Sequence, residues 1–103
     1  MRTDRAFFAA GACHLLAWTC RAAYPAEMIG IASLVLAGEN LACHTYATWG
    51  GWAFDHCGWN QESDLVAANE QYEGKSLRRI QVTTNLGQFC QDHHHRMAHE
   101  YWD

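Results

Sequence analysis

Residues 41–57 read LACHTYATWGGWAFDHC, and this stretch decides the fold because it predicts a β-hairpin. Two segments rich in aromatic and β-branched residues, 41–48 and 52–57, flank Gly50-Gly51, a dipeptide typical of tight hairpin turns. Side chains alternate between the two faces of a strand, so the loop length fixes which residues meet. With an even-numbered loop, His44 and Asp55 share one face as diagonal neighbours about 7–8 Å apart. An odd-numbered loop would place them on opposite faces.

The segments on either side of the hairpin predict an α+β domain. Apolar residues recur at helical spacing before the hairpin, and MIGIASLVL is a short apolar run that favours a buried strand, although a buried helix is also compatible with it. Turn signals separate the segments. We expect a helix, three strands, a helix, a strand and a helix, over residues 12–23, 28–36, 41–48, 52–57, 60–72, 77–84 and 86–102. This order predicts an N-terminal helix packed on a small antiparallel sheet, with two further helices.

Composition restricts the function. The chain has 103 residues, which suits a single domain over residues 1–103, and its 50% hydrophobic content disfavours disorder. The net charge is −4 and the seven basic residues form no patch, which disfavours binding to nucleic acid. No apolar run approaches the roughly 20 residues that span a bilayer, so no membrane partner is expected.

The cysteines and the first residues bear on the compartment. The five cysteines are odd in number and show no secreted disulfide framework, so we expect reduced thiols and a cytoplasmic protein. Residues 1–18 superficially resemble an export signal, but Asp4 and His14 interrupt it and no clean cleavage site follows.

Cys13, His44 and Asp55 have the chemistry of a thiol active site. Cys13 lies at the start of the predicted first helix, where backbone N–H groups favour a thiolate and can hold an oxyanion. A histidine within reach can accept the thiol proton and later protonate a leaving amine. A carboxylate on the other ring nitrogen fixes the tautomer of that histidine. The three residues fill these roles in chain order.

The stretches GACHLLAW (11–18), HTYAT (44–48) and WAFD (52–55) resemble the papain-like superfamily in the broad sense, and its transglutaminase-like members most closely. The resemblance covers about residues 6–59 and implies a papain-like core with Cys13 as nucleophile, His44 as base and Asp55 as orienting residue. It implies a thiol hydrolase or acyl transferase, meaning a peptidase, amidase, deamidase or transamidase. The substrate would be a protein, a peptide or another amide, no cofactor or metal would be needed, and a bacterial effector is one context. The chain is smaller than most active members and has no evident upstream Gln or Asn for an oxyanion hole. A non-catalytic binding or inhibitor protein on the same scaffold is therefore the alternative.

Other residues have competing interpretations. Trp49, Trp52 and Trp59 surround the candidate site in the sequence and are candidate substrate-binding residues, with core packing as the alternative. Cys13 itself can be a small buried hydrophobe, and Cys20 and Cys90 are expected in the core. His14 is expected to point away from Cys13 along the helix, and His56 is expected to face the side of the hairpin opposite His44, which makes both poorer bases than His44.

The sequence contains two candidate metal-binding sites. A zinc site built from Cys43-His44 and His56-Cys57 is disfavoured because the hairpin splits these ligands between its two faces. The final helix carries His93, His94, His95 and His99, and the pairs Cys90/His94 and His95/His99 are each one helical turn apart. A metal-binding protein that uses this helix is a further alternative, and a polar helix face is the simpler interpretation.

Overall fold

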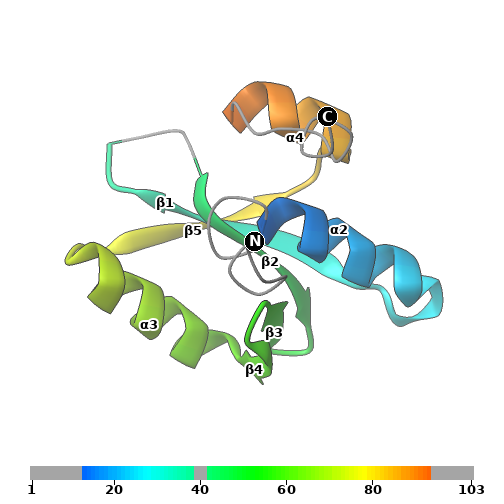
Figure 1. Cartoon of the computed structure of the whole chain (residues 1–103), viewed down its shortest axis with the longest axis horizontal. Coiled ribbons are helices and arrows are strands. Elements are labelled where there is room, and N and C mark those ends of the chain that lie inside the picture. Colours follow the sequence, from blue (N-terminus) through cyan, green and yellow to red (C-terminus); the bar gives the residue numbers. More distant parts are fainter. Residues whose placement is uncertain (1–12, 39–41, 94–103) are drawn as a thin grey trace, which may run out of the picture.

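The computed structural model describes residues 13–38 and 42–93, which form one antiparallel sheet with helices on both faces (Figure 1). The strand order is β4-β3-β2-β1-β5, and every neighbouring pair is antiparallel. The predicted α+β class is confirmed. The elements are α2 (Cys13–Ala23), the 3-10 helix η2 (Pro25–Glu27), β1 (Gly30–Leu36), β2 (Ala42–Trp49), β3 (Trp52–Asp55), β4 (Gly58–Gln61), α3 (Glu62–Glu73), β5 (Leu77–Val82) and α4 (Leu86–His93).

The alternation of side chains along β1 and β2 divides the core between the two faces of the sheet. On one face, Leu65 of α3 covers an apolar cluster whose strand members are Ala32, Leu34, Tyr46 and Ala53. On the other face, α2 and α4 cover the strands. The helix side chains that do so include Ala17 and Cys20 of α2 and Phe89 of α4. Figure 1 shows α3 and α4 on opposite sides of the sheet. Cys20 and Cys90 are both buried, as predicted.

The hairpin has a two-residue loop, one of the even-numbered lengths that the sequence left open. Trp49 pairs with Trp52 and Thr48 with Ala53, which leaves Gly50 and Gly51 as the loop. Both glycines have positive φ, of 54° and 86°, the backbone that matches the twist of two strands joined by so short a turn. The pairing therefore follows the even-numbered register, the one that puts His44 and Asp55 on a common face.

The segment after the hairpin differs from the prediction. The expected strand over 52–57 ends at Asp55, and residues 58–61 form a strand, β4, that the prediction lacked. Asp55 pairs with Gly58 across a tight turn, in which Gly58 has φ 87° and the Asp55 carboxylate accepts a hydrogen bond from the Cys57 N–H. An Asp at the first and a Gly at the fourth position is a turn signature, so the chain reverses here.

The boundaries of other elements also shift. The helix expected from residue 60 begins at Glu62, because β4 occupies the preceding residues. The strand expected from residue 28 begins at Gly30, since Met28 adopts a left-handed backbone with φ 53°. The predicted extension of the last helix over residues 94–102, with three of its four histidines, lies outside the described residues. None of the described helices is long and apolar enough to cross a membrane.

Candidate active site

His44 and Asp55 form a buried pair. His44 lies on β2 and Asp55 on the last position of β3, and the Nε2 atom of His44 is 3.0 Å from Oδ2 of Asp55. The two residues are 8% and 7% exposed. The other carboxylate oxygen, Oδ1, accepts the Cys57 N–H at 2.9 Å. Asp55 is thus held from two sides, which fixes the carboxylate that in turn orients the His44 ring.

Cys13, on α2, lies next to the pair of His44 and Asp55. It is the first residue of that helix that the structure describes, and it is 7% exposed. Its sulfur accepts a hydrogen bond from the backbone N–H of Thr45 at 3.4 Å, and it also interacts with the His44 side chain. The structure thus brings together all three residues that the sequence singled out.

The early end of β3 makes room for the sulfur. The hydrogen-bonded ladder between β2 and β3 runs from Trp49 and Trp52 to Ala47 and Phe54. In an antiparallel ladder every second residue exchanges hydrogen bonds with its partner, so Thr45 would be the next residue of β2 to do so. The chain has turned away at Asp55, and the sulfur of Cys13 accepts the Thr45 N–H instead of a strand carbonyl.

The charges of the pair are strongly coupled. Burial alone would lower the pKa of His44, but hydrogen bonds and electrostatic attraction to Asp55 and Cys13 outweigh burial and raise the pKa to about 9. Burial opposes ionisation of Asp55 too. The hydrogen bonds from His44 and from the Cys57 N–H dominate, and they lower the pKa of Asp55 below 3.8. His44 is therefore held as an imidazolium near neutral pH, next to an ionised Asp55.

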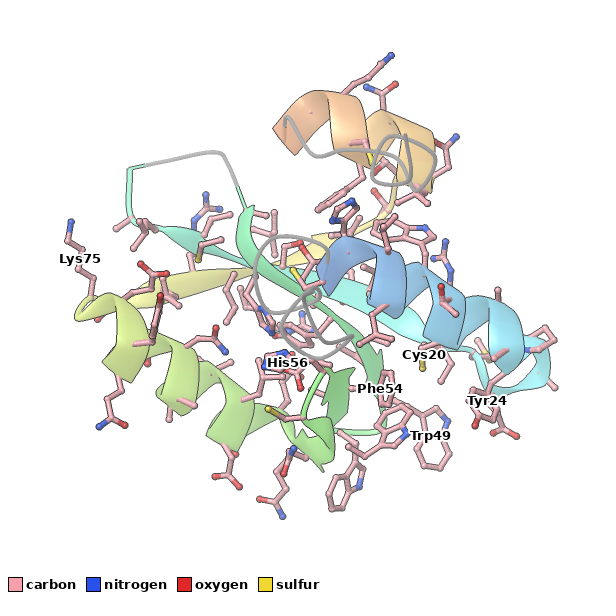
Figure 2. All side chains as sticks on the ribbon, viewed as in Figure 1. Cys20, Tyr24, Trp49, Phe54, His56 and Lys75 are labelled. Atoms are coloured by element: carbon pink, nitrogen blue, oxygen red, sulfur yellow. The ribbon has the colours of Figure 1, made fainter. Side chains whose placement is uncertain are left out.

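His56 was expected to point away from His44, and this expectation was wrong. Since β3 ends at Asp55, His56 lies in the turn, with its Nδ1 atom 4.0 Å from Oδ2 of Asp55. Its ring centroid is 6.2 Å from that of His44, and Figure 2 labels it beside the sheet. The turn signature from Asp55 to Gly58 is the signal that would have found it.

The turn also gathers the only described group of residues that is suited to a metal ion. Ligand atoms of Asp55, His56 and Cys57 all lie within 4.8 Å of one another. A metal held there would share the Asp55 carboxylate with His44. The four-ligand zinc site that the sequence disfavoured shares only His56 and Cys57 with this group. His94, His95 and His99, the histidines of the alternative metal site, lie outside the described residues.

The three candidate substrate-binding tryptophans lie together, but away from Cys13. Trp49, Trp52 and Trp59 are 48%, 43% and 40% exposed, which argues against core packing. They line an open pocket at the C-terminal end of α2, whereas Cys13 lies at the other end of this 11-residue helix. At 1.5 Å per residue, the two ends are about 15 Å apart.

A second pocket, of about 420 Å³, opens beside the site itself. It lies between the β3–β4 turn and α3, and its lining includes Asp55, His56 and Asp64. Asp55 is the one member of the trio that lines it. This pocket gives a ligand an approach to the carboxylate side of the pair.

Comparisons of the chain with models of protein families, with curated proteins and with solved structures gave no match. We therefore infer function from the geometry of Cys13, His44 and Asp55. The resemblance to papain-like proteins stays a prediction.

Proposed function

We propose that the protein is a cysteine-dependent hydrolase or acyl transferase that acts on an amide. The observation that carries this proposal is the placement of Cys13, whose sulfur accepts the N–H of Thr45 beside His44 and interacts with the His44 side chain, next to the hydrogen-bonded pair of His44 and Asp55. Acyl transfer by a thiol needs a proton acceptor for the sulfur and an orienting group for that acceptor. The Thr45 N–H adds a hydrogen bond that stabilises negative charge on the sulfur.

In the proposed reaction, the proton of Cys13 already rests on His44 before the substrate binds, and the Cys13 thiolate attacks the amide carbonyl carbon. A C–S bond forms, and the carbonyl π electrons move to oxygen. When the intermediate collapses, the C–N bond breaks and His44 gives its proton to the leaving amine, which leaves a thioester. Water or a second amine then attacks the thioester and loses a proton to His44. The C–S bond breaks, and Cys13 and His44 return to their starting state.

Within the same proposal, the substrate is a protein, a peptide or another amide, and the protein works in the cytoplasm, where its thiol stays reduced. Trp49, Trp52 and Trp59 would hold a part of the substrate well away from the reacting bond, because about 15 Å of helix separates their pocket from Cys13. The papain-like core and the effector context belong to this proposal as well.

Alkylation of Cys13 and Cys20 tests the proposal within one molecule. Both thiols lie on α2 and are 7% and 5% exposed, but burial raises the pKa of Cys20, and His44 contacts only Cys13. With iodoacetamide at pH 6, followed by peptide mass spectrometry, we expect Cys13 to react at least tenfold faster than Cys20. His44→Gln should remove most of that difference. Equal rates at the two cysteines would refute an activated nucleophile.

Activity is then sought with amide probes. Release of ammonia from glutamine peptides reports deamidation, incorporation of a fluorescent amine reports transamidation, and fluorogenic peptides report cleavage. Cys13→Ala should abolish whichever activity is found.

A non-catalytic binding or inhibitor protein is the second candidate, and one observation favours it. Cys13, His44 and Asp55 are all less than a tenth exposed, so a substrate carbonyl has little direct access to the sulfur. On this alternative the trio is a buried polar cluster that holds α2 against β2. Cys13 would then alkylate no faster than Cys20, and Cys13→Ala would weaken folding without changing any activity.

A further inference from the structure

The pocket at the C-terminal end of α2 has an unusual lining. Its volume is about 560 Å³, within the range of small-molecule sites. Among the residues that the structure describes, the lining comprises four aromatic side chains, one aliphatic side chain and one carboxylate: Tyr24, Trp49, Trp52, Trp59, Ile29 and Glu27. Figure 2 shows Tyr24 and Trp49 at the same end of the molecule, one at the end of α2 and the other beside the hairpin loop. Large aromatic surfaces left open to water in this number are typical of a binding site.

The electrostatics of the pocket favour a cation. Glu27 is the only charged residue among the described residues of its lining. The pocket also adjoins the C-terminal end of α2, where the helix dipole leaves partial negative charge. Arg21 lies in the last turn of α2, but its guanidinium lies over the Trp18 ring and is not among the described lining residues. Aromatic faces attract cations through their quadrupole, and tryptophan does so best. The net charge of −4 adds a field of the same sign over the whole molecule.

The hydrogen-bonding groups of the lining select among cations. A primary ammonium carries three N–H donors and a guanidinium five, and each loses water when it enters an apolar pocket. Of the lining side chains within residues 13–38 and 42–93, only the Glu27 carboxylate and the Tyr24 hydroxyl can accept hydrogen bonds, because an indole only donates. A quaternary ammonium has no N–H, so it needs no acceptor and gains from contact with aromatic rings and one carboxylate.

We propose that this pocket binds a quaternary ammonium group, held against Trp49, Trp52 and Trp59 with Glu27 as the counter-charge. The group can belong to a small molecule or to a trimethylated lysine side chain, since both present the same head. The inference concerns only this pocket. It does not require Cys13 to be a nucleophile, because binding can be measured in a protein that lacks the thiol.

Titration with two isosteric ligands tests this proposal. Choline and the uncharged 3,3-dimethylbutan-1-ol have the same shape around the head group and differ in charge. In the Cys13→Ala variant, followed by the indole N–H resonances of the tryptophans, we expect choline to bind at least tenfold more tightly than the alcohol. A trimethyllysine peptide, compared with its unmethylated form, distinguishes a protein-borne group from a small molecule. Equal affinities for choline and the alcohol would overturn the proposal.

Matched variants locate the binding. Trp59→Leu and Glu27→Gln should each weaken choline binding by at least fivefold, whereas Trp18→Phe should not change it. Trp18 also lies on α2, but it packs against Phe89, away from the pocket. Sedimentation at several protein concentrations tests the rival occupant. If a second copy of the chain covers the three tryptophans and choline leaves that dimer intact, the pocket is an interface between copies and the proposal is wrong.

Discussion

The backbone N–H of Thr45 donates a hydrogen bond to the sulfur of Cys13 across 3.4 Å, at a point where β2 has lost its neighbouring strand. One more ladder pair between β2 and β3 would have given this N–H a carbonyl partner and closed the edge of the sheet. The candidate site therefore exists because β3 stops at Asp55. The same turn that ends the strand holds the carboxylate in place.

Replacement of Cys13 should change the exchange rate of the Thr45 amide, because this amide donates the hydrogen bond. In Cys13→Ala the buried Thr45 N–H loses its acceptor, whereas in Cys13→Ser a hydroxyl oxygen can still accept it. We expect the Thr45 amide to exchange with solvent deuterium about tenfold faster in the Ala variant than in the Ser variant, equivalent to about 1.4 kcal/mol, within the usual value of one hydrogen bond. The amide of Ala47, which pairs within the sheet, is the internal control. Equal exchange of Thr45 in both variants would contradict the contact.

The pKa of His44 predicts a loss of stability at alkaline pH. The folded state raises this pKa from 6.5 to about 9, so it binds the proton more tightly than the unfolded chain does. The resulting stabilisation is fully present below about pH 6.5 and is lost as the pH rises through about 9. It contributes at most about 3 kcal/mol to the free energy of unfolding. Urea unfolding of the wild type and of His44→Gln between pH 6 and 10 measures it. The difference between the two should shrink with rising pH, and a constant difference would be inconsistent with the raised pKa.

Removal of the Asp55 carboxylate should lower the pKa of His44. In Asp55→Asn burial is no longer opposed by this charge, so we expect the pKa to fall by at least one unit, and we expect stability at pH 7 to fall by about 1–3 kcal/mol. An NMR titration of the His44 ring gives the first quantity and urea unfolding the second. Asp64→Asn is the control. Asp64 is an exposed carboxylate in the same neighbouring pocket, and its loss should leave the ring's titration unchanged.

Gly58 should be hard to replace. Its φ of 87° is a left-handed backbone, and a Cβ built there meets nothing within 4 Å, so the penalty is conformational. We expect Gly58→Ala to cost about 1–2 kcal/mol of stability. Gly87→Ala, in α4 and with only an ordinary contact at 3.6 Å, should instead stabilise the protein by about 0.5–1 kcal/mol. Thermal unfolding of the two variants checks the opposite signs. In addition, the 15N shift of His44 should change in Gly58→Ala if the turn positions Asp55.

The hairpin was predictable because its information is local. The Gly50-Gly51 dipeptide and the alternation around it set the loop length, and the loop length places His44 and Asp55 on one face. The turn at Asp55 was equally local, but the run WAFDHC has enough apolar residues to suggest a continuing strand. Because a continuing strand was predicted there, β4 and the position of His56 near Asp55 were not predicted.

Other features depend on contacts that no local pattern contains. Trp49, Trp52 and Trp59 are neighbours in sequence of the candidate site, yet they form a pocket with Tyr24 and Glu27 at the far end of α2. Their placement follows from how α2 lies across the sheet. That orientation results from the packing of Ala17 and Cys20 against strand residues that are far apart in the chain, and so helix periodicity alone could not give it.

By itself, the sequence determined the α+β class and the hairpin around Gly50-Gly51, and it restricted His44 and Asp55 to a common face or to opposite faces according to the loop length. Backbone conformation and side-chain alternation are set by residues close together in the chain, and the observed pairing then selected the common face. The tertiary structure decided that the sulfur of Cys13 meets Thr45 and His44, and that the tryptophans do not join them. These outcomes depend on where a helix docks and where a strand stops. Both result from the simultaneous burial of side chains that are distant in sequence.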